Sequence, residues 1–466
     1  MVLRMRRHLT AVFLPPDGIP VFSSILKMAD QHEDEIGIFH FLSLFVVAAS
    51  MRLFLMYSSA KEWFADRIEL STPLTSWSRV QEGIILLNNG ISPYAGDIVH
   101  EAPLVVTLFY GLKDVSSQFI PLIFIVIDMV IGCLLYKVAV YNTKNLLTDQ
   151  ERNKSSFAKN VSPILLTEEE FDNIPFLTTA VYLLNPYSVS TCVAQSTIIF
   201  TNLGLTLALF GALKGSSPLA TLGIALATYH SLYPIMLLAP VTLIVIKYDE
   251  GSQLSGICKC GMLFTVWIAG LLGLSYSFFN SWDFIKATYG FILGVPDLTP
   301  NIGLFWYFFT EMFEHFRVFF LWVFQINAFF YCIPLTVRLR EHPSFLACIL
   351  CLIMAIMKSY PAFGDAALPL SLLVLWKHLF PYLRNAFLIS CMLLFSSFLA
   401  PVFWYLWIYA GSANANFFFA VTLAYSTAQI LLASDVLFAF LRRERDLVRG
   451  IFPKIINGEV ATITLK

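Results

Sequence analysis

The residues of this sequence that could do chemistry do not form a known catalytic pattern. The run at 311–315 (Glu-Met-Phe-Glu-His) has the residue types of a zinc-protease helix but lacks a second histidine four positions away. A phosphate-binding glycine loop, a nucleophile elbow and a dinucleotide fingerprint are all missing from the sequence. Cys258 and Cys260 are two thiols without further ligands, whereas structural zinc needs four. We therefore expect no catalytic residue, no metal and no cofactor.

Four ionisable residues stand inside long apolar stretches: Arg52, His230, Asp128 and Asp435. Such groups are costly in hydrocarbon and are functional candidates by default. Arg52 lies near the end of the first stretch, where its side chain could extend to the membrane surface or pair with a lipid phosphate. For the two aspartates we expect hydrogen bonds to neighbouring helices.

The composition explains why such groups are rare. Of 466 residues, 30 are Lys or Arg and 31 are Asp or Glu, so 13% are charged, while 58% are hydrophobic. Soluble proteins average about 25% charged residues. The composition excludes a disordered chain, a secreted disulfide scaffold and a nucleic-acid binder with a strong basic field. It indicates a polytopic membrane protein rather than a soluble enzyme.

The predicted fold class is an all-α membrane helix bundle with about twelve transmembrane helices. A spanning helix needs about 20 apolar residues. Breaks are expected at 185–186, 229–234 and 411–416, and the last of these makes the two final spans a helical hairpin. We divide the chain into an N-terminal extension (1–35), the bundle (36–441) and a basic tail (442–466). The expected spans are 36–57, 118–140, 175–190, 195–213, 217–230, 233–247, 260–279, 317–337, 343–358, 363–380, 386–408 and 417–441.

The cations predict the orientation of the bundle. An even number of spans places both termini on one side, and the side richer in Lys and Arg is cytosolic. With both termini cytosolic, 22 of the 30 Lys and Arg residues fall on the cytosolic side and 8 on the lumenal side. We therefore expect both termini in the cytosol.

Polar residues on the lumenal side concentrate in the segments 58–117, 280–317 and 411–416. In the second segment, Asp297 lies between Pro296 and Pro300, with short apolar stretches at 284–293 and 303–309 that suit re-entrant or interfacial helices. Asp297 would then line a lipid-accessible cleft, or it would form an Asx-turn before the next helix. Trp282 and Asp283 of the same segment are further candidate site residues.

The hairpin tip carries a second group of candidates. Asn414 and Asn416 could hydrogen-bond a sugar, and Trp404, Trp407 and Tyr409 lie just before them in the chain. The alternative is that the asparagines cap the following helix and the aromatic residues form an interfacial belt.

Several long strings resemble the family of subunit U of the GPI transamidase. The resemblance covers about 35–466. The strings lie at 82–83, 90–96 (Gly-Ile-Ser-Pro-Tyr-Ala-Gly), 100–103, 182–187 (Tyr-Leu-Leu-Asn-Pro-Tyr), 226–229, 281–316, 358–361, 406–418 and 438–444.

The resemblance implies a multi-pass protein of the endoplasmic reticulum membrane. It implies a complex with four other subunits, one of them a caspase-like cysteine protease that does the chemistry. The complex attaches a preformed GPI anchor to the C-terminus of precursor proteins, and subunit U helps to recognise and hold the GPI lipid. On this basis the GPI-binding candidates are Asn414, Asn416, Trp407, Tyr409, Asp297, Trp282, Asp283 and Arg52.

The order of the motifs is also similar to the GPI mannosyltransferases, which are GT-C enzymes. These place an Asp-x-Asp-like acidic motif early in the first lumenal loop, as the catalytic base. Here that place reads Asp66-Arg-Ile-Glu69, so the acidic pair is not kept in that form. A base is needed to deprotonate a sugar hydroxyl. This resemblance implies a transferase scaffold that binds the lipid-glycan without transfer, and it leaves an active mannosyltransferase using a dolichol-linked donor as the alternative.

Overall fold

The computed structural model describes residues 39–112, 119–247, 252–451, 455–456 and 459–460. The expected extension at 1–35 lies outside the described residues. The chain divides into two units, Met1–Ser50 and Met51–Lys466. The described residues of the first unit are helical and belong to the helix Phe39–Met56. All elements from α3 (Ala60–Ala65) onward belong to the second unit.

The second unit is built almost wholly of helices. A two-residue antiparallel pair, β1 (Ile455–Ile456) with β2 (Glu459–Val460), is the exception among the described residues. The longer helices are α4 (Trp77–Asn88), α5 (Pro103–Gly111), α6 (Ile120–Asn153), α8 (Ile174–Leu184), α9 (Pro186–Val193), α10 (Ile198–Leu213), α11 (Ser217–Ser231), α12 (Leu238–Lys247), α13 (Gln253–Phe279), α17 (Glu314–Phe330), α19 (Pro343–Met357), α20 (Phe363–Leu372), η6 (Leu373–Tyr382), α21 (Ala386–Ile408) and α22 (Ala415–Arg449). Besides α3, the shorter helices are η1 (Pro93–Ala95), η2 (Lys154–Ser156), η3 (Ser162–Ile164), α7 (Glu168–Phe171), η4 (Tyr233–Leu237), α14 (Asp283–Ile285), η5 (Lys286–Gly290), α15 (Phe291–Gly294), α16 (Phe305–Glu311) and α18 (Cys332–Arg338).

The prediction of a helical membrane protein is confirmed. Seven helices among the described residues are long and apolar enough to cross a membrane, and four shorter apolar helices accompany them. The number of spans therefore stays a prediction. Two segments differ from the expectation. The stretch expected as a span over 175–190 is broken into α8 and α9, and α22 continues to Arg449, so the expected tail begins as helix.

Local chemistry explains the breaks at 185–186 and 229–234. The Asn185 side chain accepts a hydrogen bond from the Tyr187 backbone N–H at 3.0 Å, and Pro186 occupies the first position of α9, which favours a new helix start. At the second break Leu232 has φ +45°, a left-handed conformation that ends α11. The hinge expected there is confirmed.

Glycines let α10 and α11 pack closely. A Cβ atom on Gly211 would lie 2.5 Å from the Ala220 backbone nitrogen, and one on Gly223 would lie 2.4 Å from that of Ala208. Small residues allow backbones to approach in membranes, where packing rather than hydrophobicity drives association.

A buried ion pair joins the start of the second unit to α6 and α8. The Arg52 guanidinium lies 2.6 Å from the Asp128 carboxylate and also donates to the Leu183 carbonyl at 2.8 Å. Tyr182 donates to the other Asp128 oxygen at 2.8 Å. Asp435 of α22 accepts the backbone N–H groups of Arg384 and of Asn385, which is the N-cap residue of α21. The expectation that both aspartates bond to neighbouring helices is thereby confirmed.

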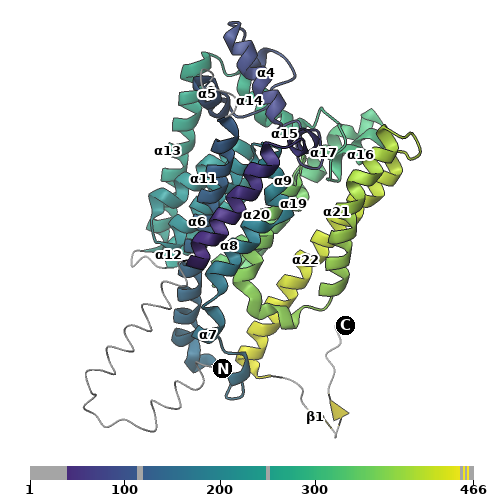
Figure 1. The fold of residues 1–466 in the computed structure, drawn as a ribbon. Coiled ribbons are helices and arrows are strands. Elements are labelled where there is room, and N and C mark those ends of the chain that lie inside the picture. The colour runs from purple at the N-terminus through teal and green to yellow at the C-terminus, as the bar shows by residue number, and fades with distance from the viewer. Residues whose placement is uncertain (1–38, 113–118, 248–251, 452–454, 457–458, 461–466) are drawn as a thin grey trace. The chain divides into compact units, whose positions relative to one another are not determined.

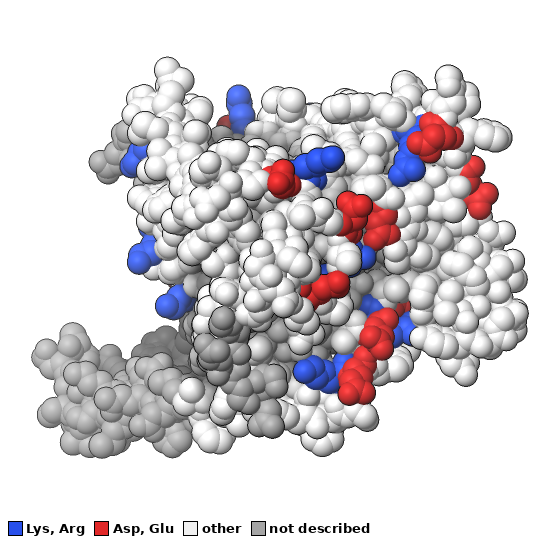
Figure 2. Space-filling model, turned by 90° about the horizontal axis from the view of Figure 1, so that it is seen from above, with Lys and Arg blue, Asp and Glu red and all other residues white. Residues whose placement is uncertain are grey.

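The three polar segments expected on one side of the membrane gather at one end of the bundle (Figure 1). Helices α4, α5 and α14 lie there with the tip of the α21–α22 hairpin, while α7 and the C-terminal part of α22 lie at the opposite end. Viewed from this hairpin end, most of the surface is uncharged, and acidic and basic side chains lie beside each other (Figure 2).

Candidate functional site

The two asparagines of the hairpin tip have different roles. The Asn414 side chain caps α22 by accepting hydrogen bonds from the backbone N–H groups of Asn416 at 3.0 Å and Phe417 at 3.4 Å. Such caps are typical where a helix starts after an extended residue. The Asn416 side-chain oxygen instead accepts a hydrogen bond from the Tyr307 hydroxyl. Asn416 therefore ties the hairpin tip to α16 of the middle segment.

The aromatic residues next to the tip are divided between interior and surface. Trp407 packs beside Trp306 and Trp404, in a cluster with Phe418. Tyr409 is 69% exposed and stacks on Tyr405. Trp407 thus supports the tip, whereas Tyr409 presents its ring to the surroundings.

Asp297 forms an Asx-turn, and an ion pair accompanies it. Its Oδ1 accepts the Thr299 backbone N–H at 2.9 Å, while its Oδ2 lies 3.2 Å from the Arg79 guanidinium of α4. Burial opposes ionisation, but the hydrogen bonds from Thr299 and the charge of Arg79 outweigh it and lower the pKa of the Asp297 carboxyl. The Asp297 carbonyl also accepts the Tyr360 hydroxyl at 2.8 Å. Asp297 therefore fixes the loop that leads into α16.

His100 joins the first segment to the second. Its ring stacks on Phe291 with centroids 3.5 Å apart, and its Nδ1 lies 2.8 Å from the Ala287 carbonyl. Burial lowers the pKa of the His100 imidazole, although the bonds to backbone carbonyls partly oppose this effect. A neutral ring at neutral pH suits a packing role.

Trp282 and Asp283 lie at the start of α14, away from the Asn414–Asn416 tip in the chain and in its contacts. The Asp283 carboxylate accepts the Ser281 hydroxyl at 2.6 Å. Trp282 is 50% exposed and stacks on Tyr276 with centroids 4.9 Å apart. Arg52 is fully buried against Asp128, so the structure does not bring it to the surface of this end.

An apolar cleft of about 800 Å³ lies between α3, α9, α20 and α21. Most of its walls are aliphatic or aromatic, and a few polar groups line it. Its lining residues are Met51, Trp63, Phe64, Arg67, Glu69, Leu70, Leu184, Asn185, Pro186, Tyr187, Val189, Ser190, Phe363, Leu370, Ser390, Leu393, Leu394, Ser397, Phe398 and Pro401. Sequence reasoning missed this cleft, because its walls come from segments far apart in the chain.

The turn between Arg67 and Leu70 connects the cleft with the hairpin tip. Arg67 binds Glu69 through two hydrogen bonds, of 3.1 Å and 2.8 Å, and both side chains line the cleft. Ile68 of the same turn packs on the tryptophan cluster beside the tip. The Glu69 carbonyl accepts the Phe363 backbone N–H at 2.9 Å, which holds the turn against α20.

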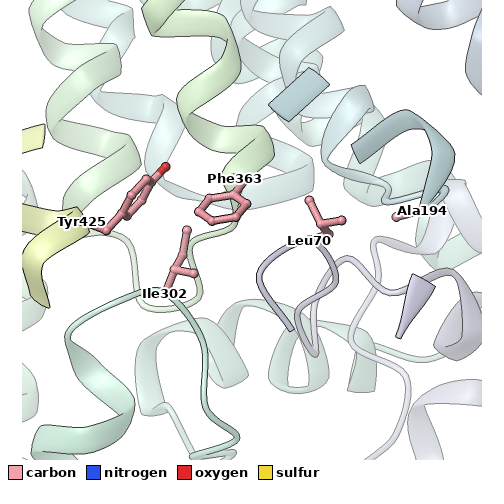
Figure 3. Close-up of a cluster of buried hydrophobic side chains, with 5 residues drawn as sticks. All are labelled: Leu70, Ala194, Ile302, Phe363 and Tyr425. Atoms are coloured by element: carbon pink, nitrogen blue, oxygen red, sulfur yellow. The ribbon is translucent and has the colours of Figure 1, made fainter. Parts of the chain in front are cut away.

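A hydrophobic cluster lies behind one wall of the cleft. Leu70, Phe363 and Tyr425 meet Ala194 and Ile302 there, and Figure 3 shows these five side chains converging from different segments. Leu70 and Phe363 also line the cleft. The cluster that supports this wall therefore draws on α20, α22 and three loops and does not depend on one element.

A second polar group lies buried next to α10 and α11, and sequence reasoning indicated His230 but not its partners. The Glu101 carboxylate lies 2.8 Å from His230 Nε2 and accepts the Thr197 hydroxyl. His230 Nδ1 lies 2.7 Å from the Thr201 hydroxyl. The only signal in the sequence was the presence of an ionisable residue in an apolar stretch. Among the described residues, no three His, Cys, Asp or Glu side chains group as metal ligands.

Comparison with known proteins gives a consistent result. The sequence model described as "GPI transamidase subunit PIG-U" matches residues 46–425. The chain is 44% identical over 434 residues to the GPI-anchor transamidase component PIGU of Mus musculus, covering 90% of this chain and 98% of that protein. It is 43% identical to the Homo sapiens protein of the same name over the same shares of the two chains. It is also 34% identical over 409 residues to the GPI transamidase component GAB1 of Saccharomyces cerevisiae, covering 87% of this chain and 95% of that protein.

Proposed function

Since the chain belongs to the PIG-U family of GPI transamidase subunits, we propose that it is a non-catalytic subunit that holds the GPI lipid. The apolar cleft beneath the hairpin tip is the observation that carries this role. It offers a place for a lipid chain next to polar groups at the same end of the bundle. The cleft would take the lipid chain and the tip the glycan of one amphiphilic ligand.

The cleft would select a lipid chain by its shape. A lipid chain already lies in hydrocarbon, so entry into the cleft gains little from the hydrophobic effect and depends on close packing. Tyr187 and Ser397 share a hydrogen bond of 2.5 Å across the cleft, which fixes α9 against α21. A preformed wall of this kind reduces the ordering cost of binding.

The head group would meet the polar rim. Glu69 engages the Nε and Nη2 atoms of Arg67, so the Nη1 edge is the part of the guanidinium that a phosphate would approach. Asn416 and the exposed Tyr409 would contact the glycan, because amides and aromatic faces suit sugars. Asp297, Trp282 and Asp283 flank the same end and remain candidates for the glycan, whereas Arg52 serves the fold.

The absence of catalysis is part of the proposal. Both oxygens of the Glu69 carboxylate are bound by Arg67, so this group is a poor general base. The chemistry would belong to a caspase-like cysteine-protease subunit, one of four partners in the complex. If instead the chain were a mannosyltransferase, it would transfer mannose when purified alone. We expect no transfer from a dolichol-linked donor, and transfer that is lost in Asp66→Ala would overturn the proposal.

The proposed location is the endoplasmic reticulum membrane with both termini in the cytosol. The 22 to 8 distribution of cations supports this orientation. In it, the end that carries the hairpin tip faces the lumen. The GPI glycan and the precursor C-terminus would meet the chain on that side.

The substitution Asn416→Ala tests the hairpin tip. It removes the acceptor of the Tyr307 hydroxyl and a candidate glycan ligand, while Asn414 still caps α22. In cells that lack the endogenous gene, we expect the variant to lower surface GPI-anchored proteins several-fold, since one hydrogen bond is worth about 1 kcal/mol. Flow cytometry of a GPI-anchored marker measures this effect.

The matched control is Asn89→Ala, an exposed asparagine at the end of α4 on the same side of the bundle. It should leave the marker unchanged, and both variants should co-purify with the partner subunits. Equal marker levels in Asn416→Ala and the wild type would remove Asn416 from the proposed site.

A further inference from the structure

A second pocket lies at the end of the bundle opposite the hairpin tip. It has a volume of about 570 Å³ and forms between the segment that carries η3 and α7, the end of η6 and the last turns of α22. Figure 1 shows α7 and the C-terminal part of α22 at this end. Its lining residues are Pro163, Ile164, Leu165, Leu166, Glu170, Phe171, Ile174, Lys377, His378, Pro381, Tyr382, Arg442 and Arg443.

Hydrogen bonds hold the wall of this pocket in place. The Ala158 backbone N–H donates to the Leu447 carbonyl at 2.9 Å, and Arg443 donates to the Ile164 carbonyl at 3.1 Å. The Gln150 side chain exchanges two hydrogen bonds with the Leu166 backbone, of 2.7 Å and 2.9 Å. The segment that carries η3 and α7 is thus held against α6 and α22, and it forms a defined wall of the pocket.

The residues that line the pocket carry more positive than negative charge. Lys377, Arg442 and Arg443 line it, and Glu170 is the one acidic lining residue. Arg443 is only 6% exposed, and its guanidinium lies 3.6 Å from a carboxylate oxygen of Glu444. The Nδ1 atom of His378 is buried without a hydrogen-bond partner among the described residues.

Cations and apolar walls together define the ligand chemistry. Guanidinium groups bind phosphate well because they present several N–H donors in a plane. Leu165, Phe171 and Ile174 supply apolar surface beside them. In the proposed orientation this pocket lies on the cytosolic side, where basic pockets between helices of membrane proteins suit anionic head groups. We propose that this pocket binds a phosphate-bearing group, the head group of an anionic phospholipid.

The test uses the purified full chain and short-chain phosphatidic acid as the probe, with binding followed by native mass spectrometry. Lys377→Gln combined with Arg442→Gln removes two solvent-exposed cations and leaves Arg443, which holds the segment that carries η3 and α7, in place. We expect the apparent dissociation constant to rise about tenfold or more, since each cation near an anionic lipid contributes about a fivefold factor.

The matched control is Arg340→Gln combined with Arg449→Gln. Both residues are exposed and lie outside the pocket. Each double variant replaces two cations by glutamine, so the net charge of the chain changes equally in both. We expect wild-type affinity for phosphatidic acid in this control, and the same thermal unfolding in both double variants. Phosphatidylcholine should bind neither variant nor the wild type specifically.

The phosphate group could belong to a lipid or to a soluble ligand, and competition with inorganic phosphate distinguishes these two sources. If it does not displace phosphatidic acid, the site takes the lipid head group with its apolar part. If it displaces the lipid at low concentration, the site is a phosphate site that a soluble ligand also fills. Equal weakening in the pocket variant and the control variant, or no binding of phosphatidic acid by the wild type, would overturn the proposal.

Discussion

Replacing Arg52 with leucine is expected to destabilise the bundle by about 3–5 kcal/mol, because the Asp128 carboxylate then stays buried without its cation. Arg52 is fully buried and bonds to Asp128 and to the Leu183 carbonyl at the end of α8. Loss of the guanidinium would therefore loosen the contact of α6 and α8 with the residues that open the second unit. The measurement is the steady-state level of the chain in membranes and its thermal unfolding in detergent.

The double variant Arg52→Leu with Asp128→Leu is the informative partner experiment. Replacing both members of a buried pair by apolar residues is often neutral, whereas removing one is not. We expect the double variant to recover most of the lost stability. If Arg52→Leu alone matched the wild type, or if the double variant were no better than the single one, the pair would not hold these helices.

Filling the cleft is expected to reduce GPI attachment strongly without unfolding the chain. Ser390 of α21 is exposed and lines the cleft, so Ser390→Trp places a large ring where a lipid chain would lie. A steric conflict of more than about 1.4 kcal/mol already lowers occupancy tenfold. We expect surface GPI-anchored proteins to fall at least about tenfold in cells that depend on the variant.

Two variants control this result. Ser390→Ala keeps the cleft open and should support normal display. Ser277→Trp places the same ring at an exposed position of α13. Only 6% of the apolar stretch of α13 is buried, so lipid should accommodate the ring. Normal display with Ser390→Trp, at wild-type protein level and with intact assembly, would contradict a role for the cleft.

Much of the fold could be predicted because membrane constraints act locally. The scarcity of charge identified the membrane protein, and Asn185-Pro186 and the 411–416 stretch marked breaks that the structure confirms. The division of α8 from α9 was predicted at the right residue, although the expected span continued past it. The continuation of α22 to Arg449 was missed, because its last turns are polar and resemble a solvated tail.

The candidate site was harder to predict. Sequence patterns indicated Asn414 and Asn416 as a pair. Only the structure shows that Asn414 caps α22, whereas Asn416 bonds to Tyr307. Asp297 proved to combine an Asx-turn with an ion pair to Arg79, which places it beside another element of the same end. The cleft depends on residues from Met51 to Pro401, and no local sequence pattern predicts that they lie together.

Photo-crosslinking with a GPI analogue that carries a photoreactive group on a lipid chain tests most directly whether the cleft holds the GPI lipid. The probe is added to the assembled complex, and crosslinked peptides of this chain are mapped by mass spectrometry. We expect crosslinks on the cleft-lining residues of α21 and α9, such as Leu394 and Val189, and their loss in Ser390→Trp but not in Ser277→Trp. Crosslinks spread over α13 and α17, with a yield that Ser390→Trp does not change, would contradict this role of the cleft.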